Sequence, residues 1–295
     1  MKNEELREFL MSRRARVNPD DAGLPAYGSN RRVKGLRREE VAILAGISVE
    51  YYTRLERGNA AGVSDSVVEG LNRALQLDEA ERAHLADFVR VANSHTTPRR
   101  RRVSHTVRPL VQQLLDSMTD APAFVLNERL DVLAANGLGR ALYAPMFGAD
   151  PRTPVNQARF MFLDPASRAF WVDWEKCAKD TAALLRTAAG RDPYNRQLSD
   201  LVGELSTRSE EFRVRWAAHD VKLHHTGVKN VHHPLVGDLT LAFESLQVSA
   251  DAGQVLLVYS AEPGSASREA LNLLAGWTAT AHVELSAVPA DRTGS

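Results

Sequence analysis

The chain has 295 residues, which is enough for two domains with separate hydrophobic cores. Its composition, 44% hydrophobic and 25% charged, is that of a globular protein, and no stretch approaches the roughly 18 apolar residues of a membrane span. The net charge is zero, yet residues 1–103 hold 19 Lys and Arg against 15 Asp and Glu, and the remainder holds 18 against 22. This asymmetry favours, weakly, a polyanionic partner for the N-terminal part.

The cysteine content and the first residues bear on the cellular compartment. Cys177 is the only cysteine, so an internal disulfide cannot form, which fits a reducing cytosol. The opening MKNEELREFL is acidic and amphipathic and lacks the apolar core of a secretory signal. We therefore expect a cytoplasmic protein that does not enter a membrane.

The N-terminal region predicts five helices and no strands. Apolar residues recur at helical spacing, and a loop rich in Pro, Gly, Asn and Asp separates the first helix from the rest. Gly46 suits the end of one helix, and Ser48 is a good N-cap for the next. We expect helices over residues 2–16, 37–45, 48–57, 65–77 and 78–93.

The second and third of these helices have the pattern of a helix-turn-helix. Ala42 is small enough for the following helix to cross over it, and Gly46 tolerates a left-handed turn. Ile47 is an apolar plug, and Tyr52 and Leu55 face inward. Five agreeing positions between suitable caps favour a motif that binds DNA.

Over these residues the chain resembles the lambda-repressor-like, XRE-type regulators. The segments RREEVAILAGIS (37–48) and YYTRLERG (51–58) carry the resemblance, which extends over residues 4–93. It implies that the second helix of the motif enters the major groove of DNA, with its N-terminal side chains at the base edges. The positions that match base contacts are Val49, Glu50 and Arg54, and those that match phosphate contacts are Arg38 and Thr53.

The side chains suit this role independently of the resemblance. Arg54 can donate two hydrogen bonds to guanine, Glu50 can accept one from cytosine, and Val49 or Tyr51 can contact a thymine methyl group. Basic residues before the motif would lie near phosphates and make the affinity salt-dependent. The expected backbone contacts are Arg31, Arg32, Lys34, Arg37, Arg38, Ser48 and Thr53. The alternative is that Glu50 and Arg54 pair with each other on a solvated helix face.

Residues 94–107 are expected to be a basic linker between a DNA-binding domain (1–93) and a second domain (108–285). The stretch SHTTPRRRRVSHT (94–106) is polar, interrupted by proline and contains four consecutive arginines. The arginines at 99–102 fit a solvated linker and an additional phosphate clamp equally well. We hypothesise that the second domain alters DNA binding through this linker.

The second domain has a different pattern. The stretch APAFVLNERLDVLAAN (121–136) predicts a β-hairpin. Helices are expected over residues 136–144, 154–161, 165–189, 193–206 and 209–218, and strands over 220–231, 236–248 and 254–260. Two strands, a helical insert and three more strands predict an α+β domain in which an antiparallel sheet has helices on one face.

This domain resembles the ligand-binding domain of the MmyB-like branch of XRE regulators. The resemblance rests on FLDPASRAFWVDWEKCA (162–178), STRSEEFRVRWAAHDV (206–221), TGVKNVHHPLVGDLTL (226–241) and LLVYSAEPGSASREALNLL (256–274), and it covers residues 108–276. It implies a PAS-like sheet with a helical cover, an internal apolar pocket and a small hydrophobic ligand such as a fatty acid. One departure is Ala135, where the family often has a tryptophan, so the pocket would have another shape.

Apolar side chains on the hairpin and aromatic side chains in the helical cover could line such a pocket. Most large aromatic residues that face a sheet simply belong to its core. A polar head group would need partners, for which Asn136, Arg140, Arg168, Asp173 and His219 are candidates. The predicted pocket residues are Phe124, Leu126, Leu133, Asn136, Arg140, Phe160, Phe162, Arg168, Trp171, Trp174, Phe212, Trp216 and His219.

Two other kinds of site are not favoured by the sequence. Five histidines (219, 224, 225, 232 and 233) are of a type that binds metals, but neighbouring strand residues such as His224 and His225 point to opposite faces. Cys177 lies in an amphipathic helical stretch and reads as a packed thiol. Motifs of a nucleophile elbow or a P-loop are missing. We therefore expect no metal site, no catalytic residues and no enzymatic activity.

The sequence thus predicts a five-helix, all-α DNA-binding domain followed by an α+β PAS-like domain. We expect a sequence-specific transcriptional regulator that binds double-stranded operator DNA as a homodimer and responds to a small-molecule ligand. No cofactor is assigned beyond that ligand. The alternatives are a constitutive DNA-binding regulator whose C-terminal domain only dimerises, and an enzyme-like C-terminal domain that is recruited to DNA.

Overall fold

The computed structural model describes residues 2–22, 35–93, 106–149, 154–222 and 225–286, with residues 2–3, 149 and 278–286 described by their backbone alone. The chain forms two compact units. The helical unit comprises residues 1–101, 182–206 and 213–223, and the sheet unit comprises residues 102–181, 207–212 and 224–295. The chain therefore passes between the units at several points. Residues 94–105 of the expected linker lie outside the described residues.

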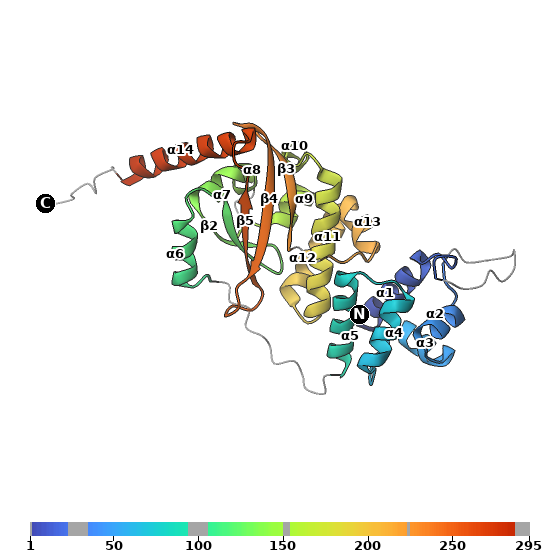
Figure 1. Ribbon diagram of the computed structural model, residues 1–295. Helices are drawn as coiled ribbons and strands as arrows, with labels where there is room; N and C mark the ends of the chain where they lie inside the picture. Colours follow the sequence, from blue (N-terminus) through green and yellow to red (C-terminus); the bar gives the residue numbers. More distant parts are fainter. Residues whose placement is uncertain (1, 23–34, 94–105, 150–153, 223–224, 287–295) are drawn as a thin grey trace. The chain divides into compact units, whose positions relative to one another are not determined.

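Residues 2–22 and 35–93, as far as the structure describes this part of the chain, form five helices, as the sequence predicts (Figure 1). They are α1 (Lys2–Arg16), α2 (Arg38–Ala45), α3 (Val49–Glu56), α4 (Asp65–Ala74) and α5 (Glu79–Asn93). Their apolar faces close on one core, in which Leu10, Leu36, Val41 and Tyr52 are inaccessible to solvent. Burial of these side chains holds the short helices together, since helices of eight residues are not stable alone.

The turn between α2 and α3 has the predicted construction. Gly46 ends α2 with φ of +70°, a left-handed conformation that glycine adopts without strain. Ser48 caps α3, because its Oγ accepts a hydrogen bond from the backbone N–H of Tyr51 at 3.1 Å. Ala42 is buried and Ile47 packs against the core. The turn therefore fixes the direction in which α3 leaves α2.

Parts of three later helices also belong to the helical unit. They are the second half of α11 (Trp174–Arg191), most of α12 (Arg196–Arg208) and the end of α13 (Glu210–Ala217). Beyond α13, Val221 is buried in the same apolar cluster as Leu6 and Phe9 of α1. The expectation that these segments belong with the C-terminal domain came from their place in the sequence, but periodicity does not reveal which core an apolar helix face joins.

The sheet unit contains the expected antiparallel sheet, with strand order β2-β1-β5-β4-β3. The strands are β1 (Ala123–Asn127), β2 (Val132–Ala135), β3 (Thr226–His233), β4 (Gly237–Gln247) and β5 (Gln254–Ser260). The hairpin of β1 and β2 is confirmed, and β5 pairs with both β1 and β4. β1, from the early part of this unit, thus pairs with β5, from its late part, in the middle of the sheet.

Helices cover both faces of the sheet, so the expectation of helices on one face is wrong. Leu115 of α6 packs with Val125 of β1 in one apolar cluster. The adjacent Phe124 contacts Tyr143 and Tyr259 instead. Because neighbouring strand residues point to opposite faces, α6 covers the face opposite this aromatic cluster. The helices of this unit, besides parts of α11 to α13, are α6 (Pro109–Ser117), α7 (Gly137–Leu142), α8 (Ala144–Ala149), α9 (Gln157–Leu163), α10 (Ala166–Phe170) and α14 (Ala266–Ser286).

Helices α6, α8 and α14 were not predicted from the sequence, and two predicted elements have clearly different boundaries. The helix expected over 165–189 is interrupted, because Trp171 forms a β-bridge with Val231 and the N–H of Val172 donates to the Asn230 carbonyl at 3.2 Å. This contact covers the outer edge of β3. The strand expected from residue 220 begins only at Thr226, since residues 219–222 are held in the helical unit.

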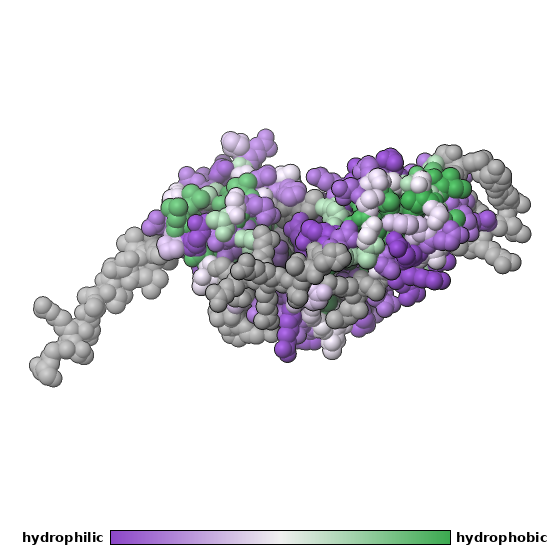
Figure 2. Space-filling view, turned by 90° about the horizontal axis from the view of Figure 1, so that it is seen from below, coloured by the Kyte–Doolittle hydropathy of each residue, from purple (hydrophilic) through white to green (hydrophobic). Residues whose placement is uncertain are grey.

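The surface is mostly polar. In the space-filling view hydrophilic residues dominate the face that is seen, and hydrophobic residues gather in small areas (Figure 2). The exposed large apolar side chains include Ile43 on α2 and the pair Leu110 and Leu114 on α6. None of the described helices is both long enough and apolar enough to span a bilayer.

Candidate DNA-reading surface and ligand-binding core

The outer face of α3 carries the side chains that the sequence assigns to base reading. Glu50 and Arg54 are exposed, and Val49 and Tyr51 are half-buried. The opposite face of the helix is buried, with Tyr52 inaccessible to solvent. An eight-residue helix held from behind in this way presents its polar side to a ligand outside the unit.

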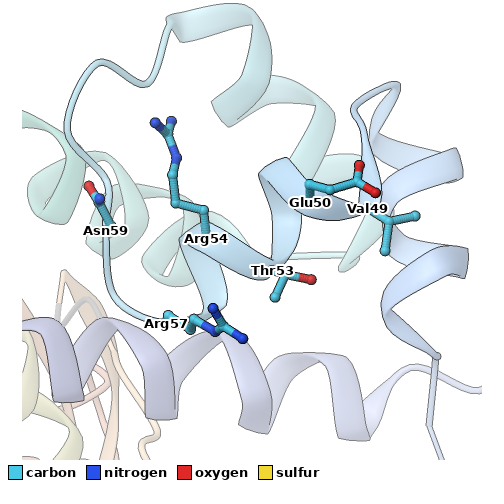
Figure 3. Close-up of a pocket in the computed structure, with 6 residues that line it drawn as sticks. All are labelled: Val49, Glu50, Thr53, Arg54, Arg57 and Asn59. Carbon is cyan, nitrogen blue, oxygen red and sulfur yellow. The ribbon is translucent and has the colours of Figure 1, made fainter.

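An open cleft of about 420 Å³ runs along this face (Figure 3). Its lining residues are Val49, Glu50, Thr53, Arg54, Arg57 and Asn59. Arg57 and Asn59 were not among the residues expected from the sequence. Arg57 lies one helical turn after Arg54, so the period of the helix could have indicated it. Asn59 follows the helix, and only the fold of the chain beyond α3 brings it to the cleft.

Arg54 stacks on Tyr51. Its guanidinium carbon lies 4.6 Å from the centre of the tyrosine ring, within the range of a cation–π interaction. The alternative pairing of Arg54 with Glu50 is not formed within the part of the chain that the structure describes. The donors of Arg54 and the carboxylate of Glu50 therefore remain available to hydrogen-bond a base edge.

A buried carboxylate fixes α3 to its neighbours. Glu56, with 2% of its side chain exposed, accepts a hydrogen bond from Arg14 Nε of α1 at 2.6 Å and pairs through its other oxygen with Arg38 of α2. Arg14 also donates to the Leu36 carbonyl at 2.8 Å. The hydrogen bond to Glu56 raises the pKa of Arg38, and burial raises the pKa of Tyr52. A buried ion with both oxygens paired is costly to disturb, so α3 is held firmly.

The predicted phosphate contacts are only partly free for that role. Arg38 is tied to Glu56, although 49% of its side chain is exposed. Ser48 uses its hydroxyl to cap α3, and Thr53 lines the cleft. Arg37 is exposed at the start of α2. Arg31, Arg32 and Lys34 lie outside the described residues.

In the sheet unit, part of the predicted pocket forms a buried aromatic cluster. Phe124 lies 4.9 Å from Tyr143 between ring centres, and Tyr143 lies 5.7 Å from Trp171. The hydroxyl groups of Tyr143 and Tyr259 are 2.7 Å apart, and burial raises the pKa of both phenols. Leu126 is buried two residues along β1 from Phe124, on the same face of the strand.

The helical insert contributes further aromatic contacts. Phe160 packs against Phe170, with ring centres 6.0 Å apart. Phe162 packs against Phe212 and Trp174, at 5.0 Å and 6.3 Å. The predicted pocket residues among them, Phe160, Phe162, Trp174 and Phe212, are all buried in the core of the sheet unit. Arg168 lies over the Trp174 ring at 3.9 Å and pairs with Glu211, so its charge is directed to the surface.

Three further predicted pocket residues have other surroundings. Leu133 packs in the apolar cluster of α6, on the other face of the sheet from Phe124. Asn136 Oδ1 accepts hydrogen bonds from the backbone of Ala123 and Gly139, and its Nδ2 donates to two carbonyls, so its side chain is fully used by the backbone. Arg140 is exposed and stacks on Phe147 at 5.2 Å.

Trp216 and His219 belong to the helical unit, whereas the aromatic cluster belongs to the sheet unit. Arg186 stacks on Trp216 at 3.7 Å from the ring centre and also hydrogen-bonds to its carbonyl. His219 Nε2 lies 3.0 Å from the carboxylate of Glu8 on α1. Asp173, the remaining candidate for a polar head group, accepts a hydrogen bond from Asn230 at 3.0 Å.

The other histidines and the cysteine have separate local partners. His232 Nδ1 lies 2.6 Å from Asp238, and His233 Nε2 lies 3.0 Å from the Ala141 carbonyl. His224 lies outside the described residues. Cys177 is buried 3.8 Å from Lys229 Nζ, and burial raises the pKa of the thiol, which makes it a weak nucleophile.

Comparison with known families agrees with these two parts of the chain. Residues 107–274 match the family described as MmyB-like transcription regulator ligand binding domain, and residues 5–85 match a helix-turn-helix domain. The first match alone covers more than half of the chain. Among curated proteins no match is found. Both matched families are binding domains, one for DNA and one for a small molecule. The protein is a DNA-binding regulator of transcription with a C-terminal ligand-binding domain, and it belongs to the MmyB-like family of transcription regulators.

Proposed function

We propose that this protein reads a specific operator sequence with α3 and that a small hydrophobic molecule in its sheet unit modulates this binding. The observation that carries the first part is the exposed cleft along α3. Arg54, Glu50 and Val49 lie there on a helix that Glu56 fixes from behind. Fixed donors and acceptors discriminate between base pairs better than mobile ones, because less side-chain freedom is lost on binding.

Trp171 supports a ligand that combines an apolar body with a hydrogen-bond acceptor. Its indole nitrogen is buried, and within the described residues it has no hydrogen-bond partner. A buried donor without a partner costs about 1–3 kcal/mol, which an acceptor on a ligand would recover. The surrounding rings of Tyr143 and Phe170 are apolar. A fatty acid, with its chain and carboxylate, has this combination of groups.

We also propose that the protein binds its operator as a homodimer. Helix-turn-helix regulators commonly read two half-sites related by two-fold symmetry, which requires two copies of the motif. In the sheet unit, Leu110 and Leu114 of α6 are 69% and 49% exposed. They are four residues apart, so they form one apolar stripe on the outer side of the helix. A second copy of α6 would cover this stripe.

Selection of DNA from a random duplex library by the full chain tests the first part of the proposal. Enrichment of one sequence with two-fold symmetry is the expected result, and binding that depends on salt but not on sequence would contradict it. The same selection separates the proposal from an enzyme that is merely recruited to DNA, when it is paired with a turnover screen on small hydrophobic compounds.

Native mass spectrometry of the purified protein tests the ligand. We expect an additional mass of lipid size that is removed by organic extraction and is retained less by a Trp171→Phe variant. Operator affinity is then compared before and after the extracted material is added back. Equal affinities would favour the constitutive regulator over a ligand-responsive one.

A further inference from the structure

A segment matched to the ligand-binding family is part of the core of the DNA-binding helices. Residues 219–222 lie inside the matched range 107–274, yet Val221 is buried in the apolar cluster of α1 to α5. Thr187 of α11 holds the same segment, since its Oγ1 lies 3.0 Å from the Lys222 carbonyl and 3.2 Å from the Lys222 backbone nitrogen. The segment is therefore anchored from both sides.

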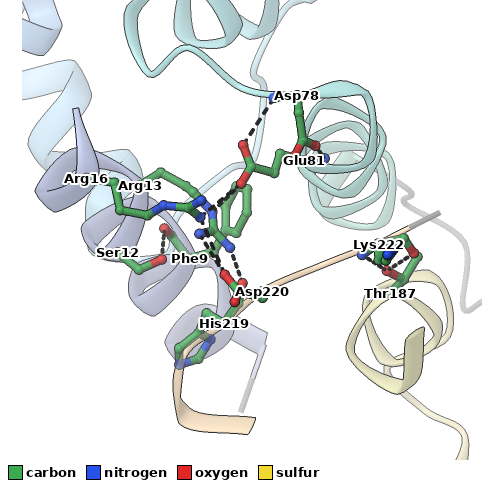
Figure 4. Close-up of polar contacts among 10 residues, drawn as sticks. All are labelled: Phe9, Ser12, Arg13, Arg16, Asp78, Glu81, Thr187, His219, Asp220 and Lys222. Carbon is green, nitrogen blue, oxygen red and sulfur yellow. Dashed lines mark hydrogen bonds and ion pairs between the residues drawn. The ribbon is translucent and has the colours of Figure 1, made fainter. Parts of the chain in front are cut away.

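Arg13 of α1 is the centre of this contact (Figure 4). Its side chain is 2% exposed, and its nitrogens meet Glu81 at 3.2 Å, Asp220 at 3.4 Å and the carbonyl of His219. Arg16, one turn further, pairs with the same two carboxylates. The charges of two arginines and two carboxylates thus balance, as a buried cluster requires.

The backbone of His219 is strained to make this contact. Its φ is +52°, a left-handed conformation that a residue with a side chain adopts only at a cost of order 1 kcal/mol. In this conformation its carbonyl reaches Arg13 while its ring reaches Glu8 of α1. Strain of this kind persists only where surrounding contacts over-determine the conformation, so the docking of this segment is specific.

The next residue of α1, Arg14, contacts the end of the recognition helix α3. Arg14 holds Glu56 at the end of α3, and Glu56 holds Arg38 of α2. Two adjacent arginines of one rigid helix thus bind the 219–220 segment on one side and α3 on the other. A displacement of the segment would therefore act on Arg13 of α1, the same helix that holds the ion pair of Glu56.

The other end of the segment leads to the ligand-binding core. β3 begins at Thr226, four residues after Lys222, and its Val231 bridges to Trp171. Lys229 of β3 lies over the Trp171 ring, with Nζ 5.8 Å from the ring centre. A molecule bound at Trp171 would therefore contact the strand that continues directly from the anchored segment.

We propose that α1, through Arg13 and Arg14, is the connection by which the ligand-binding domain acts on α3, in place of the 94–107 linker. This inference rests on the proposed function of α3 and names its regulation. Coupling between distant sites requires an element whose arrangement both sites bias. α1 is in contact with both sites, because Arg13 binds the 219–220 segment and Arg14 binds Glu56 at the end of α3.

Hydrogen–deuterium exchange of the free, full-length chain tests the connection without a ligand or DNA. In Asp220→Asn the segment loses a charged partner of Arg13, and we expect the amides of α3 to exchange roughly threefold to tenfold faster than in the wild type. Arg7→Ala removes an exposed ion pair of the same helix with Glu4 and should leave α3 unchanged. Ten Gly and Ser residues inserted after residue 99 should also leave α3 unchanged.

Two results would overturn the proposal. One is faster exchange of residues 213–222 in Asp220→Asn with no change in α3. The other is an effect of the linker insertion on α3 as large as that of Asp220→Asn. If Asp220→Asn unfolds the helical unit, Thr187→Val decides the question, since it removes both hydrogen bonds between Thr187 and the Lys222 backbone without leaving a buried charge. Faster exchange of α3 in that variant supports the connection, and unchanged exchange excludes it.

The DNA selection tests the proposed function separately from this connection. Because the exchange experiment contains no DNA, α3 can respond to the segment even if the chain selects no sequence from a random library. In that case the DNA-reading assignment fails while the connection stands. If the chain enriches an operator but the exchange of α3 does not respond to the segment, the DNA-reading assignment stands and the connection through α1 fails.

Discussion

Arg54 and Arg37 allow separate tests of the two kinds of DNA contact that we propose for the helical unit, to base edges and to phosphates. Arg54 lies in the cleft over Tyr51, whereas Arg37 is exposed at the start of α2. We expect Arg54→Ala to lose preference at one base pair, by about 5- to 150-fold, because one bidentate contact contributes roughly 1–3 kcal/mol. We expect Arg37→Ala to weaken all sequences evenly and to lower the salt slope by about one. Binding curves on the selected duplex and its single-base variants measure both effects.

Arg37 is a better test of phosphate contact than Arg38. Loss of the Arg38 side chain would remove one of the two partners of buried Glu56 and so destabilise the fold as well as the interface. Equal, sequence-independent losses from Arg54→Ala and Arg37→Ala would contradict the assignment of α3 to base reading.

His84 makes the helical unit sensitive to acid. It is buried between Phe9 and Phe88, and burial, followed by the charges of Arg186 and Arg13, lowers its pKa to about 3. As the pH falls below 6.5, the ordinary pKa of histidine, the imidazole of His84 binds a proton in the unfolded chain but not in the folded chain. The contribution of His84 is therefore complete above pH 6.5 and is lost as the pH falls towards 3, by about 1.4 kcal/mol per pH unit.

Denaturant unfolding between pH 7 and 5 measures this dependence before most carboxylates titrate. We expect His84→Gln to have a smaller loss of unfolding free energy over that range than the wild type. His219, whose pKa is lowered to about 4 by burial near Arg186 and Arg13, acts in the same direction. Glu5, whose pKa is raised by burial, acts in the opposite direction as the pH falls towards its ordinary value of 4.5. Identical slopes for the variant and the wild type would refute the role of His84.

The packing of α11 and α12 in the helical unit can be tested at two glycines, one with close neighbours and one without. A Cβ atom at Gly190 of α11 would lie 2.3 Å from the His84 ring of α5, whereas one at Gly203 of α12 would meet no atom within 4 Å. We expect Gly190→Ala to destabilise the unit by about 1–3 kcal/mol through overpacking. Gly203→Ala should stabilise it by about 0.5–1 kcal/mol, since alanine favours a helix.

Thermal unfolding of the two variants provides the comparison, because both introduce the same methyl group into a helix of the same unit. If Gly190→Ala proves as stable as Gly203→Ala, then α11 does not pack on α5 as closely as described. The sign of the difference matters more than its size, since the neighbours of a new methyl group relax to varying degrees.

For the whole molecule, we expect two copies of the chain to associate through α6. Leu110→Glu with Leu114→Glu places charges on the exposed stripe without touching Leu115, which is buried in the core of the sheet unit. We expect the double variant to sediment as a monomer at concentrations at which the wild type is a dimer. Its unfolding free energy per chain should change little once concentration is accounted for.

A matched control replaces another exposed apolar residue. Val214→Glu lies on α13 and is 62% exposed, so it tests whether a new surface charge alone prevents association. A dimer that persists in the α6 variant would place the interface elsewhere in the chain.

The family resemblance of the whole chain was accessible from sequence because its signals are local. Gly46, Ser48 and the inward-facing Tyr52 specify the turn and the buried face of α3 within a dozen residues. The sheet could be predicted for the same reason, as the strands alternate in apolar character and the hairpin is short. Caps, turns and periodicity act over a few residues, so they are legible without knowing what lies opposite in space.

The tertiary structure alone decided which core each amphipathic segment joins. Val221 and the second half of α11 pack with the DNA-binding helices, Leu133 faces α6, and Asn136 serves the backbone. An apolar stripe shows that a helix face is buried, but the partner of that face is set by contacts between residues far apart in the chain, such as Arg13 and Asp220, which are 207 positions apart. For this reason the sequence was enough to predict the surface that we propose binds DNA, and only the fold showed what holds that surface in place.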